Sequence, residues 1–167
     1  MGKHILLVSS WTNDKKVLGY YLSPPMGLYR IQHWLKDKHD VDVLDPNVEE
    51  PVSYLEKCGK YDVIGFSPTK DNLHNDVALM RYAKKLYPDA TLVAGGVEAT
   101  CNYQQLLDMD VIDYILMGEG EKALEYFLDG KVHLKLSPIP FRDPPNLFCF
   151  VYTRFADMWR THLLCQN

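Results

Sequence analysis

The sequence lacks several features that would mark a nucleic-acid-binding or membrane-spanning protein. It has no run of lysine and arginine and a formal net charge of -4, which argues against nucleic acid as the main partner, because phosphate binding needs clustered positive charge. No apolar run approaches the roughly 20 residues that a membrane-spanning helix needs, so we expect no membrane partner. The first apolar stretch is too short for a signal peptide and is typical of a first strand, so we expect a cytoplasmic protein.

Metal-binding and phosphate-binding motifs are also missing. The four cysteines, Cys58, Cys101, Cys149 and Cys165, are widely spaced without a CxxC pair, which favours reduced thiols over a zinc site. The first strand is followed by neither GxGxxG nor GxxxxGK[ST]. A phosphoreceiver would need acidic residues where Ser9, Ser10 and Ser67 stand, so that class is excluded.

What the chain does contain is an alternation of strand and helix patterns, which predicts an α/β fold with a parallel sheet and helices on both faces. With 167 residues it has room for one such domain and a tail. We expect strands at 4–8, 40–44, 61–66, 90–94 and 112–117. We expect helices at 26–38, 51–58, 73–86, 102–109 and 119–128.

Two strands end in small or hydroxyl residues, at the edge of the sheet where α/β proteins bind ligands. Ser67 and Thr69 follow one of them, and Gly95 and Gly96 follow the next. Hydroxyls can bond a ligand, and glycines let a ligand approach the backbone closely. The alternatives are a helix-capping turn for the hydroxyl pair and a plain strand-to-helix turn for the glycine pair.

Two further segments allow both a structural and a functional interpretation. Glu119 and Glu121 stand at a helix start, where the macrodipole alone accounts for acidic residues. The loop of residues 9–21 is long, and its aromatics would either pack on a flat ligand or on themselves. His74 is the one histidine near the predicted ligand edge. We interpret it as an ordinary surface residue of a helix, because nothing nearby marks it as a ligand or a base.

The tail differs from the rest of the chain. Residues 136–145 contain four prolines, which break helices and central strands and indicate a linker. We therefore expect a domain at 1–133, a linker at 134–147 and a third region at 148–167.

Four motifs together resemble one family, the N-terminal cobalamin-binding domain of cobalamin-dependent radical SAM enzymes. Their order and spacing match over roughly residues 3–129. The motifs are Pro24-Pro-Met-Gly-Leu28, Asp62-Val-Ile-Gly-Phe-Ser67, Val93-Ala-Gly-Gly-Val-Glu-Ala-Thr100 and Asp113-Tyr-Ile-Leu-Met-Gly-Glu-Gly-Glu121.

The resemblance implies a doubly wound, flavodoxin-like (Rossmann-like) sheet of five parallel strands in the order 2-1-3-4-5. It implies that cobalamin lies across the carboxyl ends of the strands, with its nucleotide tail in a groove that small residues leave open. The cofactor-binding residues that it implies are Ser10, Pro25, Met26, Ser67, Thr69, Asn72, Gly95, Gly96, Val97, Glu98, Gly118, Glu119 and Glu121.

The chain departs from related patterns in two places. The DxHxxG motif of the mutase and methionine-synthase type is missing after the first strand, so no axial histidine is expected from that position. At the spacing of the radical SAM motif CxxxCxxC the tail has Met158, His162 and Cys165, of which Cys165 alone can supply a thiolate. A [4Fe-4S] cluster and S-adenosylmethionine are therefore expected only where a complete radical SAM region exists.

The sequence thus predicts a cobalamin-binding module of, or derived from, a cobalamin-dependent radical SAM enzyme that transfers a methyl group or rearranges a radical. We do not expect this chain to be catalytic by itself. A radical SAM barrel, in cis or in trans, would dock through the aromatic tail. The alternatives are a nucleotide- or flavin-binding α/β domain and a non-catalytic domain that docks a partner.

Overall fold

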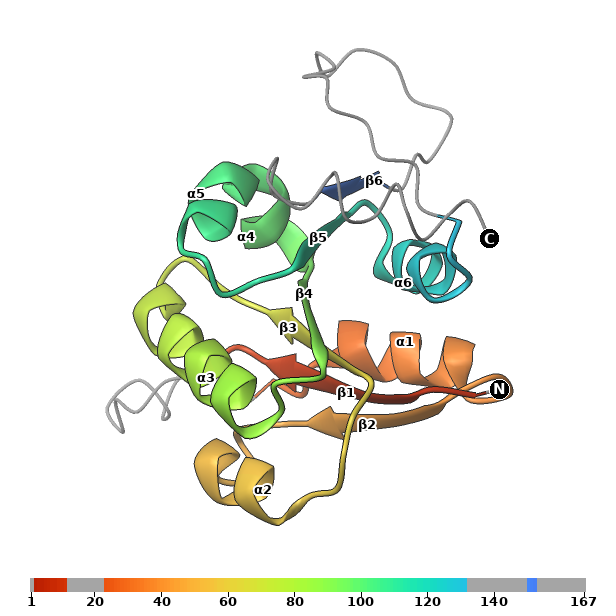
Figure 1. Cartoon of the computed structure of the whole chain (residues 1–167), viewed down its shortest axis with the longest axis horizontal. Helices are drawn as coiled ribbons and strands as arrows, with labels where there is room; N and C mark the ends of the chain where they lie inside the picture. The colour runs from red at the N-terminus through yellow and green to blue at the C-terminus, as the bar shows by residue number, and fades with distance from the viewer. Residues whose placement is uncertain (1, 12–22, 132–149, 153–167) are drawn as a thin grey trace.

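A computed structural model describes residues 2–11 and 23–131, together with the backbone of residues 150–152 (Figure 1). The strands are β1 (His4–Ser9), β2 (Asp40–Leu44), β3 (Val63–Ser67), β4 (Thr91–Ala94), β5 (Tyr114–Met117) and β6 (Phe150–Tyr152). The helices are α1 (Met26–Leu35), α2 (Pro51–Lys57), α3 (Leu73–Leu86), α4 (Gly96–Cys101), α5 (Tyr103–Asp108) and α6 (Gly120–Leu128).

The strands form one sheet in the order β2-β1-β3-β4-β5-β6. The pairs among β1 to β5 are all parallel, which confirms the predicted order 2-1-3-4-5. The strand β6 pairs with β5 in the antiparallel direction and adds an edge that the sequence did not predict. It lies within the region 148–167. The division of the chain into three regions stays a prediction.

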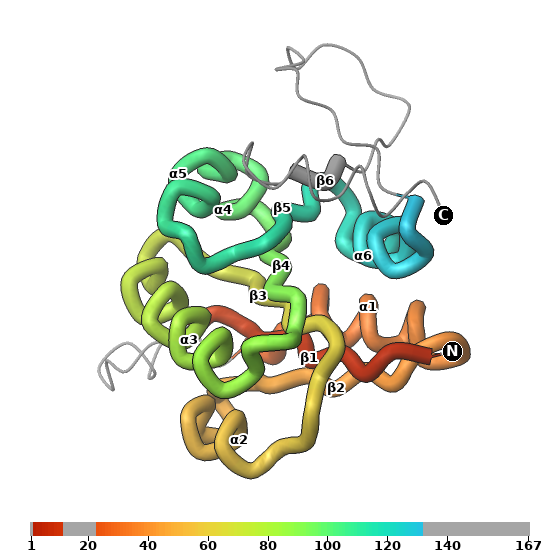
Figure 2. Tube along the Cα trace, viewed as in Figure 1, coloured from red at the N-terminus to blue at the C-terminus, as the bar shows by residue number. Residues whose placement is uncertain are grey.

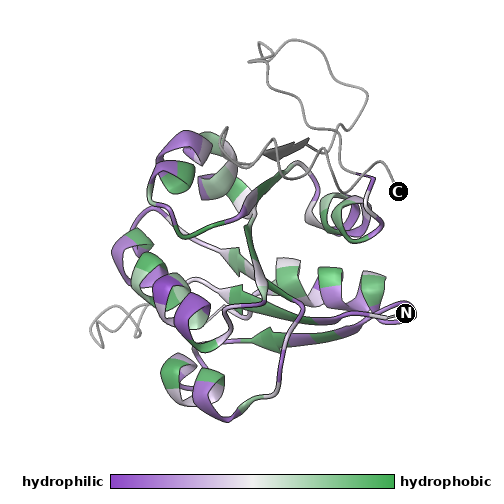
Figure 3. Ribbon diagram, viewed as in Figure 1, coloured by the Kyte–Doolittle hydropathy of each residue, from purple (hydrophilic) through white to green (hydrophobic). Residues whose placement is uncertain are grey.

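The helices cover both faces of the sheet (Figures 1 and 2). The helices α1 and α6 lie side by side on one face, and α2, α3, α4 and α5 cover the other. The side chains of β1 contribute to the hydrophobic cores on both faces of the sheet, because successive side chains of a strand point to opposite faces. Ile5 and Leu7 pack under α1 and α6, whereas Leu6 and Val8 pack toward α3. Around α3 the hydrophobic and hydrophilic colours alternate, as expected of a helix with one buried side (Figure 3).

Apart from α1 and α4, the helices begin and end within one residue of their expected bounds. The helix α1 ends at Leu35, three residues early, because Leu35 is its last buried side chain and the polar residues after it form a turn. The short helix α4 was not predicted, and it begins at Gly96, where a turn was expected. The glycine pair at its start favours a turn, so the sequence carried no clear signal for a helix here.

None of the helices in the described residues is both long enough and apolar enough to cross a lipid bilayer.

Candidate functional site

A hollow opens at the carboxyl ends of the parallel strands, on the face that α1 and α6 cover. Its volume is about 200 Å³, below the roughly 300–1,000 Å³ of pockets that enclose a whole drug-sized ligand, so it suits one part of a larger molecule. The residues that line it are Leu7, Gly27, Leu28, Arg30, Ile31, Gly65, Phe66, Ser67, Val93, Gly95, Gly96, Leu116, Gly118, Gly120, Glu121 and Leu124.

Glycine dominates this lining, with six of the ten glycines of the chain. The floor glycine, Gly65, stands in the middle of β3, where glycine weakens a strand by roughly 0.5–1 kcal/mol. A β-carbon on Gly65 would lie 3.0 Å from Leu7 Cδ2 and 3.5 Å from Val93 Cγ2. A glycine inside a strand often marks the close approach of a ligand or another backbone. A side chain at position 65 would therefore intrude on the floor of the hollow.

The two strand ends that the sequence singled out meet at the rim of this hollow. Gly95 is in extended conformation and Gly96 has a φ of +88°, a backbone conformation that L side chains rarely adopt. A β-carbon on Gly96 would stand 3.1 Å from Ser67 Oγ. Ser67, Gly95 and Gly96 thus lie close together in the lining of the hollow, and their role in binding stays a prediction.

One glycine of the lining has a structural explanation of its own. A β-carbon on Gly120 would lie 2.7 Å from Ile31 Cδ1, so glycine lets α6 pack directly against α1.

The charged side chains that line the hollow within the described residues are Arg30 and Glu121. Arg30 Nη2 lies 2.7 Å from Glu121 Oε1, and this ion pair joins α1 to α6. The rest of the lining is apolar, glycine or Ser67. The hollow is therefore suited to an apolar group, with polar interactions at its rim.

Two other predicted site residues, Ser10 and Thr69, belong to a separate cluster around Asp76. Ser10 Oγ donates to Asp76 Oδ2 at 2.7 Å and lies 2.8 Å from Thr69 Oγ1. The backbone amides of Trp11 and Thr69 also donate to the Asp76 carboxylate, at 2.8 and 3.1 Å. Burial of Asp76 raises its pKa to about 6, against these hydrogen bonds, which favour the ionised form. Asp76 thus ties together the loops that follow β1 and β3.

Most of the remaining predicted residues do not line the hollow. Pro25 and Met26 begin α1, and Met26 is largely exposed. Asn72 precedes α3 and Glu119 precedes α6. Val97 is exposed in the first turn of α4, whereas the buried Glu98 accepts a hydrogen bond from Asn102 Nδ2 at 2.8 Å. Gly118 and Glu121 do line the hollow.

The hollow also contains residues that sequence reasoning did not select. A glycine inside a strand pattern was the available signal for Gly65. No sequence pattern pointed to Arg30, because a charged residue on the polar side of an amphipathic helix is ordinary. Its position in the lining depends on how α1 packs against α6. Phe66, Val93 and Leu116 lie in strands. The apolar sequence of a strand does not show which of its residues a ligand can contact.

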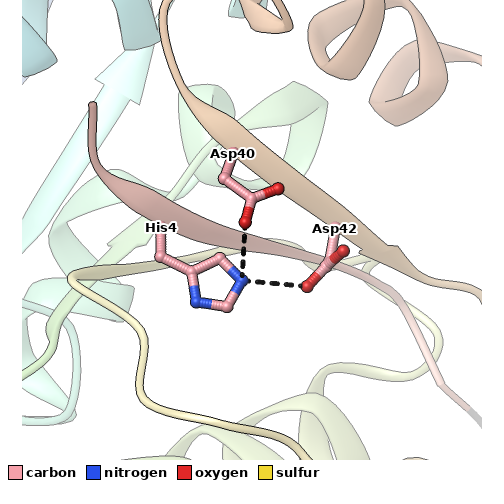
Figure 4. A group of neighbouring side chains, drawn as sticks. All are labelled: His4, Asp40 and Asp42. Atoms are coloured by element: carbon pink, nitrogen blue, oxygen red, sulfur yellow. Dashed lines mark hydrogen bonds and ion pairs between the residues drawn. The ribbon is translucent and has the colours of Figure 1, made fainter.

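A second cluster of polar side chains lies at the opposite, amino-terminal edge of the sheet (Figure 4). His4 is paired with Asp40 in the β1–β2 register, and its Nε2 lies 3.6 Å from Asp40 Oδ2 and 3.1 Å from Asp42 Oδ2. The three residues place ligand atoms close enough to hold a metal ion. Burial alone lowers the pKa of His4, but the carbonyl of Lys60 and the two carboxylates outweigh it and raise the pKa above its usual value. A protonated His4 would pair with both carboxylates, and the Tyr61 hydroxyl also donates to Asp42 Oδ2 at 2.9 Å.

A comparison with family models identifies one family for this chain. The model of the B12 binding domain matches residues 18–128. An uncharacterized methyltransferase of Pyrococcus horikoshii is 26% identical over 133 residues, which are 75% of this chain and 29% of the relative. An anaerobic magnesium-protoporphyrin IX monomethyl ester cyclase of Rubrivivax gelatinosus is 30% identical over 84 residues, which are 50% of this chain and 14% of the relative. The chain thus spans less than a third of either relative.

A solved structure shares the fold. It is that of OxsB, described as a cobalamin-dependent S-adenosylmethionine radical enzyme with aqua-cobalamin bound. The TM-score is 0.55 at 17% sequence identity, over 79% of this chain and 19% of that one. The similarity extends over most of the described residues and corresponds to one part of a much larger protein.

Proposed function

This chain belongs to the B12 binding domain family, and from that premise we propose that it binds cobalamin at the carboxyl edge of its sheet, with the nucleotide tail in the hollow between α1 and α6. The observation that carries the proposal is the glycine-lined hollow itself. Its place in the sheet is the one where α/β folds bind ligands.

The residues of the hollow fit the chemistry of this tail. The tail ends in a flat, apolar benzimidazole base, and the hollow offers apolar walls from Leu7, Val93 and Leu116 with an open floor at Gly65. Burial of apolar surface is the driving force that such a site supplies. Because the hollow holds about 200 Å³, the much larger corrin must lie outside it, over the loops that follow the strands.

The chain's own residues would bind and orient the cofactor. Ser67 and the Gly95–Gly96 turn would flank the tail, while the loops that Asp76 joins would hold Ser10 and Thr69 at the carboxyl edge of the sheet. Bound cobalamin supplies a cobalt centre that carries a methyl group or assists a radical step. None of the described residues that line the hollow is a histidine, so an axial ligand would not come from this wall.

We further propose that the module serves a longer cobalamin-dependent radical SAM enzyme that transfers a methyl group or rearranges a radical. Support comes from the relatives, which are named as a methyltransferase and a cyclase, and from the short share of each that this chain spans. The barrel would act in cis or in trans, through the aromatic tail of residues 148–167. That tail falls outside the described side chains.

A binding titration tests the proposal. We expect the purified chain to bind aquocobalamin at one site and to shift its absorbance toward the base-off spectrum, because a base held in the hollow cannot also ligate cobalt. Retention of an orange colour through gel filtration would be the simple check. Retention of a yellow flavin with no uptake of cobalamin would favour the nucleotide-binding alternative, and no uptake of either would reject the proposed ligand.

A further inference from the structure

The charged side chains that line the hollow in the described part of the chain form a single ion pair. Among its described lining residues, Arg30 and Glu121 alone are ionisable, and they meet through Arg30 Nη2 and Glu121 Oε1 at 2.7 Å. The side chain of Arg30 is 73% exposed, whereas that of Glu121 is 17% exposed. The guanidinium therefore lies at the mouth, where the hollow meets solvent, and the carboxylate anchors it from the inner side.

A guanidinium has more donors than one ion pair uses. It carries five N–H groups in a planar fork that matches phosphate oxygens, and the 2.7 Å contact with Glu121 is made by Nη2. Glu121 can hold the guanidinium in place while other N–H groups bind a second acceptor. An arginine fixed in this way at the mouth of an apolar hollow is suited to an anion that follows an apolar group inside.

The same two helices carry a matched pair of charges away from the hollow. Trp34 Nε1, one turn further along α1, and Lys38 Nζ, in the turn that follows α1, both donate to Glu125 on α6. Together with the Arg30–Glu121 ion pair, these hydrogen bonds to Glu125 show that polar interactions connect this part of the chain to α6 at two positions. Lys38 and Glu125 do not line the hollow, so they offer an internal control for a purely structural role of Arg30.

On the basis of the cobalamin site proposed above, we propose that Arg30 binds the phosphodiester of the nucleotide tail and so selects for ligands that carry this tail. The tail places its apolar base first and its phosphate next, in the order in which the hollow presents its apolar walls and the Arg30 guanidinium. Charge-assisted hydrogen bonds to phosphate are about twice as strong as neutral ones, which makes this contact a source of specificity.

Three probes separate the parts of the ligand. Cobinamide has the corrin without the tail, cobinamide phosphate adds a phosphate without the base, and cobalamin has both. Dissociation constants for each are measured on the whole chain, on Arg30→Gln and on the control Lys38→Gln. We expect Arg30→Gln to weaken cobalamin and cobinamide phosphate by about tenfold and to leave cobinamide unchanged. Lys38→Gln should leave all three unchanged, and thermal midpoints of both variants verify folding.

The outcomes distinguish this inference from the proposed function. If the unmodified chain binds neither cobalamin nor cobinamide, the cobalamin site itself is wrong and Arg30 has no such role. If the unmodified chain binds cobalamin and Arg30→Gln weakens all three probes equally, or none, the phosphate contact is overturned while the cobalamin site stands. Equal effects of Arg30→Gln and Lys38→Gln would mean that both act through the packing of α1 against α6.

Discussion

Ser67 and Gly96 meet at the rim of the hollow, where the serine hydroxyl oxygen lies 3.1 Å from the position that a β-carbon on Gly96 would take. The two residues follow neighbouring strands, β3 and β4, which pair in parallel so that their carboxyl ends lie together. Gly96 also holds a φ of +88°. Space and backbone conformation therefore both require glycine at this position.

The substitution Gly96→Val is expected to damage binding and folding together. A β-branched side chain at positive φ costs on the order of 1–3 kcal/mol of folding free energy, and it also intrudes on Ser67. We expect a lower thermal midpoint without ligand and a cobalamin dissociation constant raised by roughly 30- to 1000-fold, for a steric cost of about 2–4 kcal/mol. A folded variant with unchanged affinity would remove Gly96 from the site.

The substitution Gly65→Ala separates binding from folding. Glycine to alanine within a strand removes an entropic cost, and the new β-carbon would meet Leu7 Cδ2, the flexible end of a side chain, at 3.0 Å. We expect the thermal midpoint to change little and cobalamin to bind about 5- to 150-fold more weakly, for an intrusion of about 1–3 kcal/mol. Cobinamide, which has no base to enter the hollow, should bind unchanged.

Gly59→Ala is the control for Gly65→Ala. A β-carbon on Gly59 would meet nothing within 4 Å, and Gly59 does not line the hollow. Equal loss of cobalamin affinity in both variants would show that the floor of the hollow does not contact the ligand.

The sequence predicted the sheet well because its signals were local. Buried apolar runs such as that of β1 and the alternation with helices determine a parallel sheet, and the resemblance supplied its order. The strand β6 could not be predicted in the same way, because it has only 3 residues and so shows no clear strand pattern.

The candidate site was predictable only where strand ends define it. Ser67, Gly95 and Gly96 come together because parallel strands end at one edge, a consequence of topology. Ser10 and Thr69 also follow strands, but the buried carboxylate of Asp76 draws them into their own network. That carboxylate belongs to the pattern of α3, where an acidic residue near the start of a helix has an ordinary explanation.

We expect no iron–sulfur cluster on this chain. The two described cysteines do not form a ligand set: Cys58 is half-buried beside the Tyr87 hydroxyl, and Cys101 is exposed at the end of α4. Cys149 and Cys165 lie outside the described residues. Anaerobic reconstitution followed by iron and sulfide analysis should give far less than one cluster per chain, and stoichiometric incorporation of four irons would contradict this prediction.

We expect cobalt to have no histidine ligand from the protein. The DxHxxG motif, which would place an axial histidine after the first strand, is missing from this chain, where Ser9, Ser10 and Trp11 stand instead. Electron paramagnetic resonance of bound cob(II)alamin should therefore lack the superhyperfine splitting of an axial nitrogen. A nitrogen triplet that persists with cobinamide, which has no base of its own, would identify a protein histidine and contradict the prediction.

The carboxylate of Asp76 gives a prediction about pH. Its side chain is 2% exposed, and the cost of desolvating the charge outweighs the hydrogen bonds from Trp11, Ser10 and Thr69, which raises the pKa from 3.8 to about 6. Between these values the native state binds more protons at this site than the unfolded state does. The contribution of Asp76 to stability therefore falls as pH rises through this interval.

Comparison with Asp76→Asn isolates this contribution, because asparagine has nearly the same shape and does not titrate. As pH falls from 7 to 4, we expect the wild type to gain up to about 3 kcal/mol of unfolding free energy relative to Asp76→Asn, the equivalent of about two pKa units. Urea unfolding of both proteins at several pH values measures the difference, and titrations of all other groups largely cancel in it. A wild type that loses stability relative to the variant on acidification would show that the hydrogen bonds outweigh burial and that the pKa of Asp76 is lowered instead.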